Sequence, residues 1–105
     1  MATDHSLERR FKQSVARGVT LVDLGASWCD PCRAQTSIIR ELERRFSPAA
    51  RFKIMDIEKY RDIALQLGIQ SIPTIILYKN GREMRRFIGL QTRDTLGRAL
   101  RLLME

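Results

Sequence analysis

The spacing of apolar residues along the chain predicts a helix at its start. Over residues 6–17, apolar side chains recur at every fourth position among charged residues, which is the pattern of an amphipathic helix. These side chains are Leu7, Phe11 and Val15. Gly18 marks the expected end of this helix, and either Asp4 or Ser6 is a suitable N-cap.

Three stretches rich in β-branched and aliphatic residues predict strands, over residues 19–24, 51–57 and 75–78. The first has so little polar alternation that we expect it to be buried on both faces, at the centre of a sheet. Asn80-Gly81 is typical of a two-residue type I′ hairpin. Residues 82–88 should therefore form a fourth strand, antiparallel to the third, and Gly89 should end it.

Three further helices follow from the 3.6-residue period. Residues 33–46 carry an apolar stripe, and Pro48 disfavours helix at the residue before it. Residues 60–67 predict a short helix, and the last helix begins after Thr92, a good N-cap. Because the first two strands flank a helix, they should be parallel and joined by a right-handed crossover. The chain is therefore predicted to be an α/β protein with the order αβαβαββα.

Length and composition indicate a single domain over residues 1–105 that is 44% hydrophobic and 30% charged. No apolar run is long enough to span a bilayer. The first ten residues contain no apolar segment of the signal-peptide type, so we expect a cytoplasmic protein.

The net charge of +7 raises the question of nucleic-acid binding. However, the basic residues are spread along the chain, without a long basic run or interleaved aromatic residues. A solvated basic surface is the better interpretation, and no nucleic-acid partner is expected. Such a surface would still attract acidic protein partners.

The only tryptophan and the only two cysteines lie within five residues, as Trp28-Cys29-Asp30-Pro31-Cys32. Two cysteines with this spacing, after a strand and entering a helix, indicate a reversible redox pair. A purely structural disulfide is the first alternative, although closing so short a loop stabilises a fold little. A zinc site is the second, but it normally needs four ligands, and His5 is the remaining candidate. No metal ligand set is therefore predicted.

Two neighbours of the cysteines bear on their chemistry. Cys29 precedes a helix whose free N–H groups and dipole favour a thiolate, and Pro31 is tolerated in the first turn. Asp23 lies in a strand where an apolar residue is expected, and burial of its carboxyl would raise the pKa. Either Asp23 exchanges protons behind the cysteine pair, or it faces outward at the strand end.

From Phe11 to the C-terminus, the chain resembles the thioredoxin family. Four motifs carry this resemblance, all in register. They are Val22-Asp23 ahead of the cysteines, the Trp28-Cys29-Asp30-Pro31-Cys32 centre, Ile72-Pro73-Thr74, and Lys79-Asn80-Gly81 with Gly89 after it. The resemblance implies a three-layer α/β/α fold, here with a mixed sheet of about four strands flanked by four helices.

The resemblance also implies roles for individual residues. Cys29 would be the exposed nucleophile, Cys32 the buried resolving thiol, and Asp23 the group that exchanges a proton with Cys32. Pro73 would be a cis-proline facing the disulfide. The remaining residues of the implied substrate-docking surface are Trp28, Ile72, Gly89 and Leu90.

The sequence departs from the family pattern in three places. The family's first strand has little counterpart in Met1–His5. The lysine often found near the buried aspartate falls on Ile54, and Lys53 should face the other way. Asp30 replaces the usual glycine, and its negative charge should disfavour the Cys29 thiolate. A less stable thiolate would make the protein a stronger reductant. Asp30 and Pro31 are therefore the residues expected to tune the redox pair.

The function implied is reduction of disulfides in protein substrates by dithiol–disulfide exchange, catalysed by a monomer without a cofactor. Electrons would come from a flavin-dependent thioredoxin reductase that uses NADPH, or from another reductase. Two alternatives remain open: a thiol oxidant or isomerase with the same fold, and a non-catalytic binding or regulatory subunit.

Overall fold

The computed structural model describes residues 5–105, and its elements follow the predicted order. The helices are α1 (Ser6–Ser14), α2 (Asp30–Phe46), α3 (Arg61–Gln66) and α4 (Arg93–Met104). The strands are β1 (Val19–Gly25), β2 (Ala50–Asp56), β3 (Thr74–Lys79) and β4 (Arg82–Ile88). The predicted fourth strand is confirmed residue for residue, and α2 begins three residues earlier than expected.

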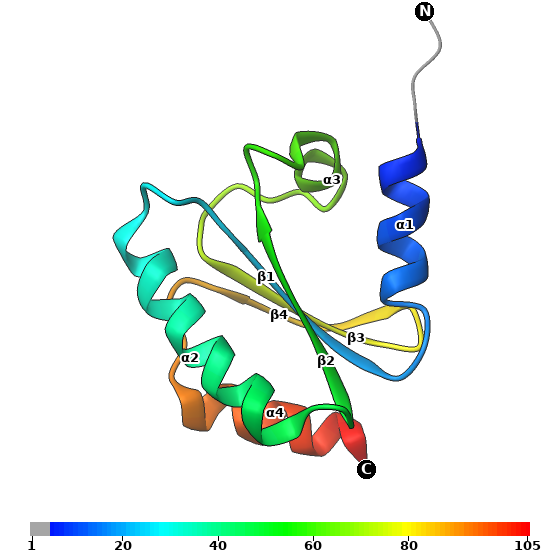
Figure 1. The fold of residues 1–105 in the computed structure, drawn as a ribbon, viewed down its shortest axis with the longest axis vertical. Helices are drawn as coiled ribbons and strands as arrows, with labels where there is room; N and C mark the ends of the chain where they lie inside the picture. Colours follow the sequence, from blue (N-terminus) through cyan, green and yellow to red (C-terminus); the bar gives the residue numbers. More distant parts are fainter. Residues whose placement is uncertain (1–4) are drawn as a thin grey trace, which may run out of the picture.

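The four strands form one mixed sheet in the order β2-β1-β3-β4 (Figure 1). β1 pairs parallel with β2 and antiparallel with β3, which in turn pairs antiparallel with β4. Asn80 and Gly81 both have positive φ angles, as a type I′ turn requires. The central position of β1 and the crossover through α2 are confirmed.

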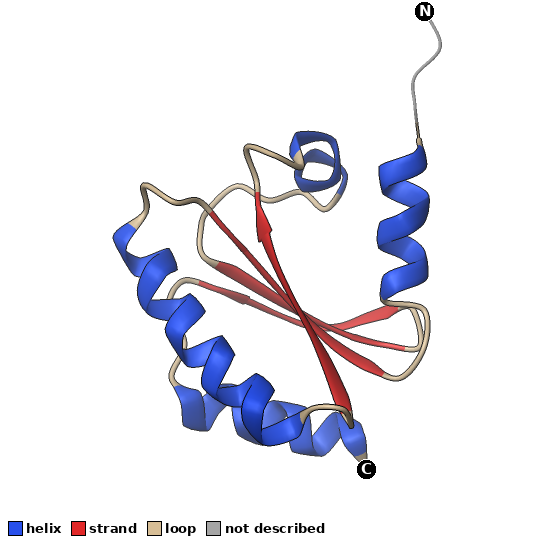
Figure 2. Cartoon of the chain, in the orientation of Figure 1, coloured by secondary structure: helices blue, strands red, loops and turns tan. Residues whose placement is uncertain are grey.

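Helices cover both faces of the sheet, so the fold has three layers (Figure 2). The core on one face joins α2 and α4 to the sheet through Ile39, Leu42, Leu96 and Leu100. On the other face, Phe11 and Val15 of the N-terminal segment pack with Ile63 of α3 and with Tyr78. The sheet thus separates two apolar layers. The loop after β1 and the loop before β3 lie at one end of the sheet and contain Cys29 and Pro73.

The first helix begins at Ser6, as predicted, but its N-cap and its end differ from the prediction. His5, rather than Ser6, occupies the N-cap position, because its carbonyl accepts the first helical N–H; the other candidate, Asp4, lies outside the described residues. The helix ends at Ser14 instead of Arg17. Beyond it, the Val15 carbonyl accepts the Gly81 N–H at 2.9 Å, so the β3–β4 hairpin draws this segment out of the helix.

Of the first five residues, in which little counterpart of the family's first strand was expected, only His5 is described. Within residues 5–105 no strand precedes α1, and β2 therefore lies at one edge of the sheet.

Candidate active site

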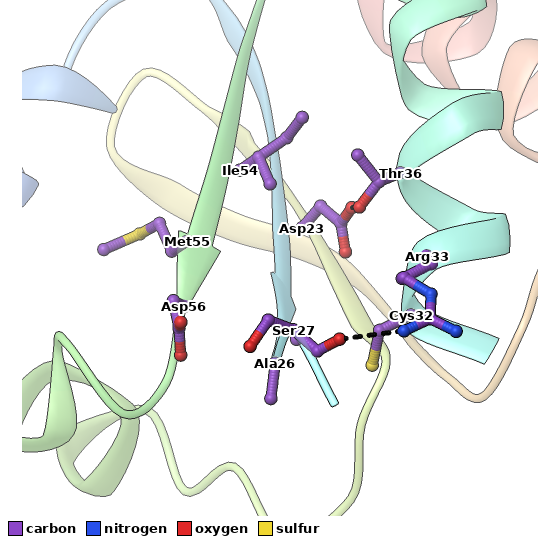
Figure 3. A pocket seen from close by; sticks show the side chains of 10 residues that line it. Asp23, Ala26, Ser27, Cys32, Arg33, Thr36, Ile54, Met55 and Asp56 are labelled. Atoms are coloured by element: carbon purple, nitrogen blue, oxygen red, sulfur yellow. Dashed lines mark hydrogen bonds between the residues drawn. The ribbon is translucent and has the colours of Figure 1, made fainter. Parts of the chain in front are cut away.

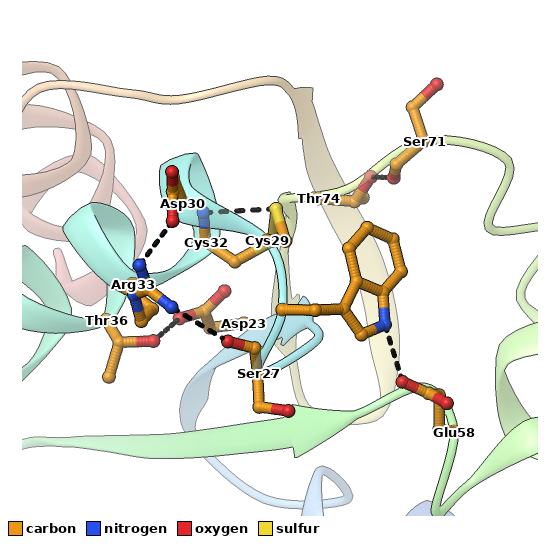
Figure 4. The surroundings of a disulfide bond; sticks show 11 residues. Asp23, Ser27, Cys29, Asp30, Cys32, Arg33, Thr36, Glu58, Ser71 and Thr74 are labelled. Atoms are coloured by element: carbon orange, nitrogen blue, oxygen red, sulfur yellow. Dashed lines mark hydrogen bonds and ion pairs between the residues drawn. A yellow bond between two sulfur atoms is a disulfide. The ribbon is translucent and has the colours of Figure 1, made fainter.

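The two cysteines lie where β1 ends and α2 begins, and they are joined by a disulfide bond (Figure 4). Cys29 is the N-cap of α2, and its sulfur accepts the Cys32 N–H at 3.3 Å. Pro31 lies in the first helical turn, as predicted. A sulfur at this position faces the free N–H groups and positive dipole end of α2, which stabilise negative charge.

Both cysteines are buried while the disulfide is closed. The exposed fraction is 7% for Cys29 and 4% for Cys32. The expectation of an exposed Cys29 is therefore wrong for the oxidised protein, although Cys29 remains the more accessible of the two. The reason is local packing, since Ala26, Ile57 and Ile72 surround the pair.

Gly25 allows this close packing at the end of β1. A Cβ atom added there would lie 3.0 Å from both the Cβ and the sulfur of Cys32. Contacts at this distance are tighter than most, so a side chain here would require the start of α2 to shift by a few tenths of an ångström. This function of Gly25 depends on the tertiary approach of α2 and was not predicted from the sequence.

Asp23 is buried in β1, with an exposed fraction of 2%, which excludes the outward-facing alternative. Burial raises the pKa of its carboxyl to about 6, while the hydroxyl of Thr36, which donates a hydrogen bond at 3.4 Å, lowers it in part. Thr36 lies one turn beyond Cys32 in α2 and was not singled out from the sequence. Among the described residues, its hydroxyl is the side-chain donor that reaches this carboxyl.

Asp23 and Cys32 line the same cavity, whose volume is about 300 Å³ (Figure 3). Ile54 and Arg33 also line it, and no lysine is among the described residues that do so. Lys53 instead borders a groove with Phe11 and Ile63, beside α1 and α3. Phe52 packs in the core on the α2 and α4 side of the sheet and Met55 in the core on the other side, so successive residues of β2 face opposite sides. The cavity is large enough for water, and the carboxyl of Asp23 is among its polar groups.

Asp30 is not an isolated charge. Its carboxylate forms an ion pair with Arg33, whose guanidinium also donates to the Ser27 carbonyl at 3.2 Å. The side chains of Asp30 and Arg33 are 82% and 64% exposed, so solvent screens both charges. Arg33 therefore offsets the effect on the Cys29 thiolate that was expected from Asp30 alone.

This pairing predicts the outcome of a double-mutant experiment. Asp30→Asn should change the rate at which reduced Cys29 reacts with iodoacetamide at neutral pH by less than about twofold in the wild-type background. In an Arg33→Ala background, where the carboxylate is unpaired, the same change should accelerate the reaction by about fivefold. Equal effects in the two backgrounds would show that Arg33 does not compensate Asp30.

The predicted docking residues come together around the disulfide. Ile72 packs against both cysteines, and the Ile72–Pro73 peptide bond is cis. The Gly89 N–H donates to the Pro73 carbonyl at 2.9 Å, and Leu90 is half exposed. The segment with Ile72 and Pro73 lies against the cysteine cluster, and a hydrogen bond joins it to the segment with Gly89 and Leu90.

Trp28 is 66% exposed, and its indole N–H donates to a carboxylate oxygen of Glu58 at 2.6 Å (Figure 4). Glu58 is itself held by Asp56, whose side chain accepts the Glu58 N–H at 2.8 Å. Glu58 was not predicted as a partner of Trp28, because the two residues lie thirty positions apart along the chain.

Residues 5–105 contain no group of three or more His, Cys, Asp or Glu side chains placed to hold a metal ion. Within the same range, no helix combines the length and apolar character needed to cross a membrane.

Comparison with known proteins places this geometry in a family. The family model described as Thioredoxin matches residues 2–101. A thioredoxin of Chlamydia muridarum is 40% identical over 86 residues, covering 82% of this chain and 83% of the relative. One of Chlamydia caviae is 38% identical over 90 residues, covering 86% and 87%.

The solved structures agree. The oxidised form of mitochondrial thioredoxin 3 from Saccharomyces cerevisiae matches with a TM-score of 0.83 and 25% identity, covering 91% of this chain and 90% of that one. A thioredoxin variant from Halobacterium salinarum matches in fold with a TM-score of 0.81 and 23% identity, covering 100% and 88%. The chain belongs to the thioredoxin family, and it is a protein dithiol–disulfide oxidoreductase.

Proposed function

We propose that Cys29 is the nucleophile, Cys32 the resolving thiol, and Asp23 the group that accepts the Cys32 proton. The observation that carries this assignment is the asymmetry of the pair. The sulfur of Cys29 accepts an N–H at the start of α2, whereas Cys32 borders the cavity that Asp23 lines. The first position favours a thiolate that attacks, and the second favours a thiol that needs a base.

In the reaction, the Cys29 thiolate attacks one sulfur of a substrate disulfide. A bond forms between Cys29 and that sulfur, the substrate disulfide breaks, and one substrate thiolate leaves. Cys32 then gives its proton to Asp23 and attacks the Cys29 sulfur. This closes the Cys29–Cys32 disulfide and releases the second substrate thiolate, so that two electrons have passed to the substrate.

The substrates we propose are proteins whose disulfides lie in extended, accessible segments. Trp28, Ile72, Pro73, Gly89 and Leu90 would form the docking surface, with the Ile72 backbone offering hydrogen bonds to the extended segment. Support comes from the exposure of Trp28 and Leu90 beside a buried pair of sulfurs, since exposed apolar groups around a reactive centre are typical of a binding site.

We further propose that the protein works as a reductant, in the cytoplasm and as a monomer, without a bound cofactor. Its electrons would come from a flavin-dependent thioredoxin reductase that uses NADPH. This donor is the usual one in the family, and the surplus of basic residues would attract an acidic docking face.

The reduction potential of the Cys29–Cys32 pair tests this direction. We expect a value near that of reducing thioredoxins, about −270 mV, measured by equilibration with glutathione or dithiothreitol. We also expect the protein to accelerate insulin reduction with thioredoxin reductase and NADPH. A potential near about −120 mV would favour a thiol oxidant. No acceleration of insulin reduction, even with dithiothreitol, would favour a non-catalytic binding subunit.

A further inference from the structure

Gln35 is a buried polar side chain that the reaction above does not use. Its exposed fraction is 0%, although it lies in the middle of an apolar helix face in α2. Burying an amide is costly unless its donors and acceptors are satisfied. Gln35 sits one helical turn beyond Cys32, so any contact it makes is fixed relative to the cysteine pair.

Both ends of the Gln35 amide bind one backbone position, Gln91. The Gln35 oxygen accepts the Gln91 N–H at 2.8 Å, and the Gln35 amide nitrogen donates to the Gln91 carbonyl at 3.1 Å. These two bonds join segments that are 56 positions apart in the sequence. In Figure 1 the connection from β4 to α4 runs past α2. The two hydrogen bonds of Gln35 join this connection to the helix.

The tied segment carries part of the proposed docking surface. Gln91 directly follows Gly89 and Leu90, and Thr92 after it is the N-cap of α4. The Gln91 side chain also donates to the Gly89 carbonyl at 3.2 Å. The position of Gly89 and Leu90 is therefore set from the Pro73 carbonyl on one side and from Gln35 on the other.

We propose that Gln35 is a positioning residue that fixes the docking segment Gly89–Gln91 relative to the cysteine pair. It would preorganise the surface that receives a protein substrate, and preorganisation lowers the entropy lost on binding. It would not alter the reactivity of the sulfurs themselves. This inference rests on the proposed docking role of Gly89 and Leu90.

Gln35→Met tests the proposal, because methionine has a similar volume and no hydrogen-bonding amide. We expect the second-order rate constant for insulin reduction by the reduced protein to fall about tenfold. The rate constant with dithiobis(nitrobenzoate), too small to need the docking segment, should stay within about twofold of wild type. The reduction potential should also be unchanged. If Gln35→Met does not fold, Gln35→Asn replaces it, since its amide is one methylene too short to reach both groups of Gln91.

Two further variants separate the possible explanations. Val15→Ala removes buried volume on the opposite face of the sheet and reports the effect of lost stability alone, so its two rate constants should keep the wild-type ratio. Leu90→Asp tests the docking surface directly and should slow insulin reduction selectively.

Results that differ from these expectations distinguish an error in the positioning role from an error in the docking surface. If Leu90→Asp slows insulin reduction selectively and the Gln35 variants do not, the positioning role is wrong while the docking surface stands. If Leu90→Asp has no selective effect, the proposed docking surface itself is wrong. Equal losses with both substrates in the Gln35 variants would place the effect on the cysteines and overturn the inference.

Discussion

Cys32→Ser traps the protein on its substrates as a stable mixed disulfide. The Cys29 thiolate still attacks, because its helix N-terminus is intact, but a serine hydroxyl at position 32 cannot displace the substrate sulfur. Turnover in the insulin assay should fall to the uncatalysed rate. Incubation of the reduced variant with insulin should yield one covalent adduct per molecule, visible by mass spectrometry and released by dithiothreitol.

Cys29→Ser is the matched control, since it removes one sulfur from the same ring and likewise leaves one cysteine. It should also lose turnover, but it should form the adduct far more slowly, because the Cys29 sulfur accepts an N–H at the start of α2, whereas Cys32 borders the cavity that Asp23 lines. Adducts that form at equal rates in the two variants would contradict the asymmetric roles. Faster trapping by Cys29→Ser would reverse the assignment.

The pattern of the sequence predicted the order and type of all eight elements because local and tertiary preferences agree in them. The strand over residues 82–88 is an example: an Asn-Gly turn fixes the start of the strand and its antiparallel direction, and Gly89 with a positive φ ends it. The shift of register between Leu77 and Tyr78 had no such local signal. The motifs around the cysteines are contiguous in sequence, so their placement at the start of a helix followed from the chain alone.

The residues that were not predicted make contacts between segments that are far apart in the sequence. The end of α1 is determined by the hairpin at Gly81, which lies more than sixty positions away. Glu58 meets Trp28, and Gln35 meets Gln91, only after β2, α3 and the sheet are assembled. A single sequence holds no local signal for such pairs. The chemistry was therefore predictable from the sequence, whereas the residues that hold its surroundings in place were not.

The free energy of unfolding should depend on pH through Asp23. Burial raises the pKa of its carboxyl from an ordinary value of 3.8 to about 6 in the folded protein. Between these two values the folded protein binds a proton that the unfolded chain has lost, so stability falls as the pH rises through this window. A shift of this size corresponds to about 3 kcal/mol. This loss of stability is negligible below about pH 3 and complete above about pH 7.

Asp23→Asn removes the titration, so the stability difference between variant and wild type should itself change with pH. The amide also has an effect on the free energy of unfolding that does not depend on pH. This effect cancels when the difference between variant and wild type at one pH is compared with that at another. In urea unfolding of the oxidised proteins, the variant should gain about 2.5 kcal/mol relative to wild type between pH 4 and pH 8. Asp62→Asn, at an exposed position of α3, controls for the loss of one negative charge and should show no such change.

The same variant should resolve mixed disulfides more slowly, because Cys32 then has no base beside it. We expect release of reduced insulin to slow by about tenfold or more at pH 7 and the difference to shrink toward pH 9, where hydroxide removes the thiol proton unaided. This profile ties stability and turnover to one carboxyl. A variant that is less stable than wild type at every pH, with unchanged turnover, would show that Asp23 contributes only to packing in β1.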